Sequence, residues 1–181
     1  MSGIRNLINK YKKIAEDLPE QRQKLALIYT ADAFDLVQDR IQNDGIDARG
    51  NLMKKYSERP FNWSKLNPTE FNAPSKVEAF KKDAKAKKNN GSYSTFRKAY
   101  GLTTSKRTLT FDGTMFASIE QYITYHDEFK TIVEIRASNA KEQMKVDQNS
   151  RIVGINILAF GKAEQDMLSD LNKERIKEIL K

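Results

Sequence analysis

The spacing of apolar residues predicts a long helical region at the N-terminus. Residues 4–17 carry apolar side chains at helical intervals, with lysines on or near the polar side. A second helical stripe spans residues 25–41 and ends at Gly45, because glycine readily adopts the left-handed conformation that caps a helix. Pro19 lacks an amide donor and fits the first turn of a helix better than its interior, so we expect two helices that meet at a bend near Pro19.

The apolar pattern weakens between residues 46 and 90, which hold three of the four prolines. Such a long irregular segment is usually functional or ordered by a partner. Within it, residues 75–88 combine good helix formers with a Ser75 cap and Glu78 three positions later, which predicts a short, basic, exposed helix. We therefore expect a single domain over residues 1–181 with an irregular basic insertion at about residues 57–90.

The hydrophobic period changes within residues 107–125. The first half alternates apolar residues with threonines, as in a strand, whereas beyond Gly113 the apolar residues recur every four positions, as in a short helix. One apolar cluster shared by the two elements would explain this change. Its predicted members are Leu109, Phe111, Met115, Ile119 and Ile123.

The C-terminal third predicts a hairpin and a final helix. A turn at residues 126–128 joins a strand around Ile123 to an alternating strand over residues 131–137. The polar residues 139–149 are typical of a loop or flap, the apolar residues 151–160 of an extended segment, and residues 164–180 of an amphipathic helix. This order predicts an α+β fold, with a small antiparallel sheet packed against long N-terminal and C-terminal helices and a short helix after the first strand.

Composition narrows the class of protein. The chain has 181 residues, 39% hydrophobic and 31% charged, with nine Phe and seven Tyr, so we expect a soluble folded protein without a signal peptide or membrane span. The absence of cysteine excludes disulfides and thiol nucleophiles, and a single histidine excludes a multi-histidine metal site within one chain.

The net charge of +8 arises from one segment of the sequence. Residues 76–107 contain ten basic and two acidic residues, whereas the rest of the chain is balanced. A local basic segment indicates contact with an acidic partner, such as DNA or another protein's carboxylates, although a solvated arm that only aids solubility explains the same pattern. Both interpretations stay open.

Candidate catalytic groups are few. Three carboxylate pairs and His126 lie in segments where solvated charge is the ordinary explanation, and no recognisable nucleophile motif accompanies the histidine. The pairs are Asp32 with Asp35, Asp127 with Glu128, and Glu164 with Asp166. The glycines form neither a Walker loop nor a dinucleotide fingerprint. We therefore expect no enzymatic activity, no cofactor and no metal.

Three aromatic residues alternate with basic ones in residues 93–100. Tyr93, Phe96 and Tyr100 are spaced to share one side of a short helix, beside Arg97 and Lys98. Aromatic and basic residues interleaved in this way resemble a single-stranded nucleic-acid surface. Packing into a core or against a neighbouring subunit is the favoured interpretation, because aromatic side chains dominate such burial.

A motif runs through residues 91–119. Its positions are Gly91, Ser92, Tyr93, Phe96, Arg97, Lys98, Gly101, Thr108, Leu109, Thr110, Phe111, Gly113, Met115, Ser118 and Ile119. This run resembles the core of the phage virion morphogenesis or tail completion family, a head-tail connector or neck family, in which a Tyr and an Arg precede an L-T-L-T-G-x-M-x-x-S-I sequence. Residues 41–50 and 157–160 resemble the flanking parts of the same family. The segment of residues 76–88 looks like an addition to it.

The resemblance implies a non-enzymatic subunit of a ring at the head-to-tail junction or tail end of a tailed bacteriophage virion, assembled in the host cytoplasm. Implied partners are further copies in six- or twelve-fold rings, portal or other connector proteins, tail proteins and DNA in the channel, with no membrane. Residues expected to contact DNA or a partner are Lys81, Lys82, Lys85, Lys87, Lys88, Arg97 and Lys98; expected subunit contacts are Phe61, Trp63, Phe71, Tyr93 and Phe96. The alternatives are a basic DNA-binding accessory module and a small hydrolase built around His126.

Overall fold

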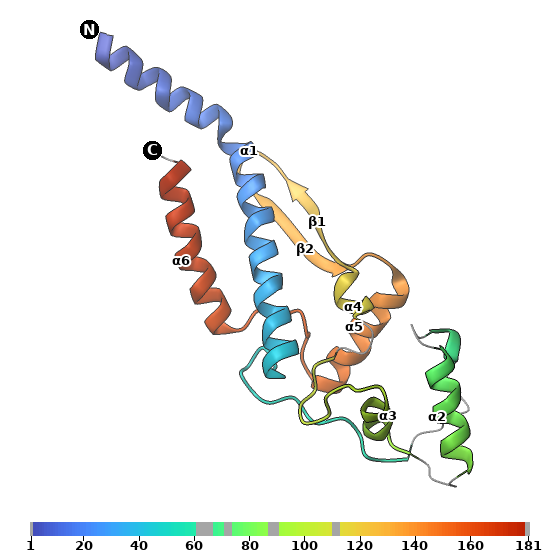
Figure 1. Ribbon diagram of the computed structural model, residues 1–181. Coiled ribbons are helices and arrows are strands. Elements are labelled where there is room, and N and C mark those ends of the chain that lie inside the picture. Colours follow the sequence, from blue (N-terminus) through green and yellow to red (C-terminus); the bar gives the residue numbers. More distant parts are fainter. Residues whose placement is uncertain (1, 61–66, 71–73, 87–90, 110–112, 180–181) are drawn as a thin grey trace.

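The computed structural model describes residues 2–60, 67–70, 74–86, 91–109 and 113–179. The protein is an α+β structure, as the sequence predicted, with one two-stranded antiparallel sheet among the described residues. The sheet lies against the long N-terminal helix, and the C-terminal helix lies along the same helix (Figure 1). Both termini are at the same end of the molecule (Figure 1).

Helix α1 runs without interruption from Ser2 to Asp39, so the prediction of two helices that meet at Pro19 is wrong. Pro19 lies inside the helix, where its ring removes one backbone hydrogen bond and crowds the preceding turn. The axis of α1 changes direction along its length (Figure 1), which is the usual effect of an internal proline. The helix continues on both sides because only one bond of the ladder is lost.

A π-helical turn, η1 (Arg40–Asp44), follows α1 and ends at Gly45. Gly45 has a φ of 70°, and its amide donates to the carbonyl of Arg40 at 2.9 Å, so the predicted left-handed cap is confirmed. A Cβ at this position would also lie 3.0 Å from the Cβ of Lys106. Glycine is therefore required both by the backbone conformation and by the close approach of residues 106–107.

Strands β1 (Ile119–His126) and β2 (Thr131–Ala137) form the predicted hairpin. They pair in register from Ile119 opposite Ala137 to His126 opposite Thr131, with an irregularity between Ile123 and Tyr125. The turn covers residues 127–130, slightly later than the predicted 126–128, because His126 still pairs with Thr131 in the sheet. Asp127 closes it, because its Oδ1 accepts from the amides of Phe129 and Lys130, both at 2.7 Å.

The predicted strand around Leu109 is wrong for the part that the structure describes. Residues 107–109 are not in a strand, and Leu109 has a φ of 54°, which breaks an extended conformation. Phe111 lies outside the described residues. The predicted short helix is present as α4 (Thr114–Ala117), preceded by Gly113 with a φ of 82°.

The segment predicted as a polar flap is a helix, α5 (Ala140–Val153). Asn139 caps it, because its side-chain oxygen accepts from the amide of Glu142 at 3.0 Å. Within α5, only Glu142 and Val146 are buried. The other residues of the helix are largely polar, and this composition led to the wrong prediction of a loop. The predicted extended segment 151–160 is also wrong, because Gly154 ends α5 with a φ of 80° and turns follow.

The C-terminal helix α6 (Lys162–Ile179) agrees with the predicted helix over residues 164–180 within its described part. Helix α6 packs mainly on α1. The sheet is covered mainly by α1 and not by α6. Gly161 precedes α6, and a Cβ there would lie 2.8 Å from the carbonyl oxygen of Ala48. Glu164 accepts a hydrogen bond from the amide of Gly161, which satisfies one of the free donors at the helix start.

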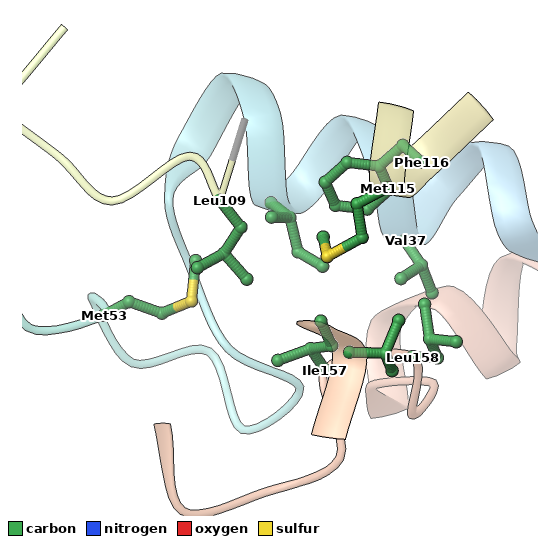
Figure 2. Packing of buried hydrophobic residues seen from close by; sticks show 9 residues of the cluster. Val37, Met53, Leu109, Met115, Phe116, Ile157 and Leu158 are labelled. Carbon is green, nitrogen blue, oxygen red and sulfur yellow. The ribbon is translucent and has the colours of Figure 1, made fainter. Parts of the chain in front are cut away.

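The main hydrophobic core lies where α1, α4, α5 and the segment after α5 meet (Figure 2). Its buried members are Val37, Ile41, Met53, Leu109, Met115, Phe116, Val146, Ile157 and Leu158. Ile119 packs against this cluster, so the predicted sharing of Leu109, Met115 and Ile119 is confirmed. Ile123 is not part of it and is exposed, because β1 extends away from α4 beyond this point.

A second, smaller cluster joins α2 (Pro74–Ala86) to α3 (Tyr93–Ala99). Val77 and Phe96 are fully buried in it, and the rings of Phe80 and Phe96 meet at 5.2 Å between centroids. The predicted basic helix is therefore present, but one face of it is packed. It begins at Pro74, so Ser75 is a helical residue and not the cap. A short 3-10 turn, η3 (Pro68–Glu70), precedes it.

Candidate assembly surfaces

Only some of the predicted contact residues of the basic segment are exposed. Of these residues, Lys82 and Lys98 are exposed, and Lys76, which was not among the predicted contacts, is exposed as well. Lys81 lies 4.0 Å from Glu78 as an ion pair on α2. The side chains of Lys85, Lys87 and Lys88 lie outside the described part of the chain, as do Phe61, Trp63 and Phe71.

Arg97 is wrongly predicted as a partner or DNA contact, because only 1% of it is exposed. Its Nε donates to the carbonyl of Thr103 at 3.3 Å and its Nη2 to the hydroxyl of Thr108 at 3.4 Å. Its guanidinium carbon also lies 4.0 Å from the ring centroid of Tyr56. The Arg97 side chain therefore joins α3 to Tyr56 and to residues 103–108 of the same chain.

Tyr56 joins two arginines in this region. Arg107 lies 5.1 Å from the ring centroid, and its Nε donates to the carbonyl of Lys54 at 2.8 Å. The Tyr56 hydroxyl accepts from the amide of Leu109 at 3.0 Å. Burial lowers the pKa of Arg107, and Tyr56 opposes that shift. These contacts join residues 54–56 to the motif at residues 107–109. The sequence analysis did not predict these contacts, because a buried arginine leaves no local sequence pattern.

The aromatic trio of α3 is packed within the chain. Phe96 is fully buried, so its prediction as a subunit contact is wrong; Tyr93 is half-buried and packs on the same cluster. The Phe96 and Tyr100 rings lie 4.8 Å apart between centroids. Burial raises the pKa of Tyr93. Of the two interpretations of this trio, packing into a core fits the observed burial.

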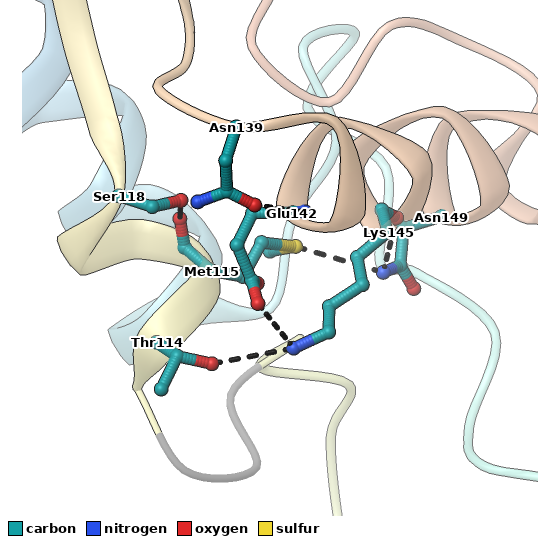
Figure 3. A network of polar contacts seen from close by, with 7 residues as sticks. All are labelled: Thr114, Met115, Ser118, Asn139, Glu142, Lys145 and Asn149. Carbon is teal, nitrogen blue, oxygen red and sulfur yellow. Dashed lines mark hydrogen bonds and ion pairs between the residues drawn. The ribbon is translucent and has the colours of Figure 1, made fainter. Parts of the chain in front are cut away.

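Side chains at and after Thr114 hold α4 against α5 (Figure 3). Lys145 of α5 reaches the carboxylate of Glu142 at 2.8 Å and the hydroxyl of Thr114 at 3.3 Å. The hydroxyl of Ser118 donates to the carbonyl of Met115 at 2.8 Å. Asn149 of α5 also lies 3.8 Å from the sulfur of Met115, so Met115 and Ser118 have structural roles where α4 meets α5 and the hairpin.

The hairpin has two different faces. Gln121 and Val133 belong to the inner face, and the Gln121 amide faces the backbone of α1 at Leu27 and Ala31. The outer face carries Tyr122, Tyr125 and Ile132 beside Glu120, Glu134 and Arg136, because successive side chains of a strand alternate between faces. The guanidinium of Arg136 lies 4.3 Å from the centroid of the Tyr122 ring.

The outer face continues into the hairpin turn. Phe129 at the turn is 81% exposed, and Tyr125 and Ile132 are also exposed. The hydrogen bond that Tyr125 donates to Asp127 raises the pKa of the phenol and lowers the pKa of the carboxyl. Asp127 is therefore ionised at neutral pH, so the turn presents an aromatic side chain beside negative charge.

The first half of α1 forms a second exposed apolar surface. Ile8, Tyr11 and Leu18 are 49%, 63% and 40% exposed, respectively, and their spacing puts them on one side of the helix. In Figure 1 this part of α1 projects beyond the rest of the molecule. The sequence contained the signal, an amphipathic stripe, but gave no indication that the chain itself leaves it uncovered.

The carboxylate pairs considered for catalysis have structural partners. Asp32 pairs with Arg175 of α6 at 2.6 Å, and Glu164 pairs with Arg40 at 3.1 Å. Asp127 shapes the hairpin turn. His126 is exposed, and its Nδ1 lies 2.8 Å from the hydroxyl of Thr131. Within the described ranges there is no group of three or more metal-ligating side chains.

An open groove of about 940 Å³ lies between β2 and α5. Its lining includes carboxylates of Glu134 and Asp147 and guanidiniums of Arg136 and Arg151. The charges of both signs along an open surface fit a protein contact better than an enclosed small-molecule site.

Comparisons with known proteins give no match, whether the chain is scanned against protein-family models or searched against curated proteins and solved structures. Among the described helices, none combines the length and apolar character that crossing a membrane requires.

Proposed function

We propose that this protein is a structural subunit of a tailed-bacteriophage head-to-tail connector or tail completion ring and carries no catalytic chemistry. The phage assignment depends on the resemblance of residues 91–119 to the virion morphogenesis family. Several motif positions have structural roles that suit such a subunit: Ser92 caps α3, Gly113 precedes α4, and Met115 lies in the main core.

The observation that carries the assembly role is the exposure of two apolar surfaces among the described residues. One is the first half of α1, and the other is the outer face and turn of the hairpin. Large exposed apolar patches on a folded protein usually mark interaction sites. Two different surfaces on one chain suit a head-to-tail contact, which closes into a ring when the rotation between copies allows it.

Imaging of the purified protein, with light scattering after size exclusion, tests this proposal. We expect rings of uniform symmetry, alone or on addition of a portal protein. A protein that stays monomeric across the accessible concentration range, with and without portal protein, would contradict the proposal.

A basic DNA-binding module is the second candidate, because α2 exposes Lys76 and Lys82 while its Val77 side faces α3. A nucleic-acid binder loses affinity steeply as salt rises, since it releases counterions from the phosphates. Titration of duplex DNA at low and moderate salt separates the candidates. A ring subunit is expected to bind DNA weakly alone, whereas a steep salt dependence would favour the DNA-binding module.

A further inference from the structure

The first half of α1 is an uncovered helix with an excess of positive charge. Residues 2–18, here called the arm, precede Pro19. Ile8, Tyr11 and Leu18 supply its exposed apolar side. Residues 2–15 hold four basic residues and no acidic one, and Glu16 and Asp17 follow, so the arm has a net charge of +2.

The hairpin as a whole has the opposite net charge. Residues 119–137 contain four acidic and two basic residues. Tyr125, Phe129 and Ile132 are its exposed apolar side chains. An apolar surface with acidic neighbours is complementary to the arm both in chemistry and in charge.

The arm does not cover the hairpin of its own chain. Arg22, just beyond the arm, donates a hydrogen bond to the carbonyl of Glu128 in the hairpin turn. The inner face of the hairpin lies against the second half of α1, so the outer face points away from that helix. A helix that continues past the turn therefore leaves the outer face free for another molecule (Figure 1).

We propose that the arm of one copy lies along the outer face of the hairpin of the next copy. The lengths agree: the 17 residues of the arm make a helix of about 25 Å, and the eight residues of β1 span about 26 Å. The contact is heterologous, because each copy gives its arm to one neighbour and its hairpin to the other. This inference rests on the proposed ring and names the surfaces that build it.

Two apolar variants test the contact. The arm variant Ile8→Asp/Tyr11→Asp and the hairpin variant Phe129→Asp/Ile132→Asp each remove one side of it. Each variant alone is expected to lose ring formation, with association weakened about tenfold or more. A matched control, Met144→Asp/Ile152→Asp, changes two exposed apolar residues of α5 and is expected to leave rings intact.

Mixing the two variants gives a sharper result. Each mixed pair retains one intact arm and one intact hairpin, so we expect heterodimers that do not extend further. An arm that pairs with another arm, or a hairpin with another hairpin, would not produce these heterodimers. Mixtures that stay monomeric would overturn the inference.

Charge reversal gives a second test that does not depend on the apolar residues. Lys12→Glu/Lys13→Glu and Glu128→Lys/Glu134→Lys are each expected to weaken assembly, whereas mixing these two proteins restores alternating rings. Rings formed by the arm variants as readily as by the wild type would overturn the arm contact while leaving the proposed function standing. A wild-type protein that forms no ring would instead contradict the proposed function itself.

Discussion

The two halves of α1 carry the same kind of apolar stripe in very different surroundings. In the second half, Ala33 and Val37 are fully buried, and Phe34 packs on the main core. In the arm, Ile8 and Tyr11 are about half exposed or more. Hydrophobic periodicity thus identifies which side of a helix seeks contact, but it does not identify whether the contact lies in the same chain.

The difference between the halves has a physical origin in their neighbours. The second half of α1 is flanked by the hairpin and by α6, and the ion pair between Asp32 and Arg175 fixes α6 against it. Neither element extends along the arm (Figure 1). Substitutions of the buried residues in the second half should therefore reduce the free energy of unfolding, whereas substitutions of apolar residues in the arm should change association.

The largest effect is expected from Phe116→Ala. Phe116 is buried, and its ring lies 6.5 Å from that of Phe34 on α1, between centroids. The substitution leaves a cavity between α4 and α1, so we expect the free energy of unfolding to fall by about 3–5 kcal/mol. Chemical denaturation measures it. Met144→Ala, at an exposed site, is the control, and equal effects of the two changes would contradict the assigned core.

The next effect concerns the ion pair between Arg40 and Glu164. Both side chains are nearly buried, and Arg40 also donates to the carbonyl of Ala159 at 3.1 Å. Arg40→Met leaves the Glu164 carboxylate buried without its partner, so we expect a loss of about 3 kcal/mol in the free energy of unfolding.

A double variant tests whether the loss comes from the unpaired charge. Arg40→Met/Glu164→Gln removes both charges and keeps an oxygen that accepts from the amide of Gly161. We expect it to be more stable than Arg40→Met alone when both are measured by denaturant unfolding. Losses that simply add would show that the two side chains act independently.

Much of the fold was predictable because local signals agreed with the tertiary structure. The helix cap at Gly45 and the hairpin turn are formed by hydrogen bonds between residues close in sequence. The cap of α5 was also readable, since Asn139 precedes Glu142 by three positions, but the polar composition of the helix obscured it. The apolar residues Ile157 and Leu158 enter the core from turns, so their pattern wrongly indicated a strand.

The candidate surfaces were less predictable than the fold. Exposure depends on which elements pack together, and the sequence alone does not specify this for Phe129 or Tyr11. Arg97 illustrates the opposite error, because a basic residue in a basic segment is buried between Tyr56 and the backbone of residue 103. The distribution of charge along the sequence therefore identified the basic segment of residues 76–107, but not which of its basic side chains are exposed.

A smaller effect is expected at Asp47, in the loop that follows the second half of α1. Burial alone would raise the pKa of Asp47. Its Oδ1 accepts hydrogen bonds from the amides of Asn51 at 3.0 Å and Arg49 at 2.9 Å. These bonds and the nearby arginines outweigh burial, so the pKa of Asp47 lies below its ordinary value. Because the folded-state pKa is lowered, the stabilisation is present above the unfolded-state pKa and is lost as pH falls through the folded-state pKa.

Asp47→Asn isolates this contribution. We expect it to reduce the free energy of unfolding by about 1 kcal/mol at neutral pH. The difference from the wild type should shrink as pH falls below about 4, the ordinary pKa of an aspartate in an unfolded chain. Denaturant unfolding at several pH values measures it, and a difference that grew on acidification would contradict the assigned hydrogen bonds.

The smallest effect on stability is expected from Tyr11→Ser in the arm. Tyr11 is 63% exposed, so its truncation removes little buried area, and we expect the free energy of unfolding to change by no more than about 0.5 kcal/mol. The same substitution should weaken association between copies, measured by sedimentation at several concentrations. Lys24→Ser, at an exposed site in the second half of α1, is the matched control and should alter neither property strongly. A loss of stability at Tyr11 comparable to that at Phe116 would mean that the arm is covered by its own chain, and the two halves of α1 would then no longer differ in kind.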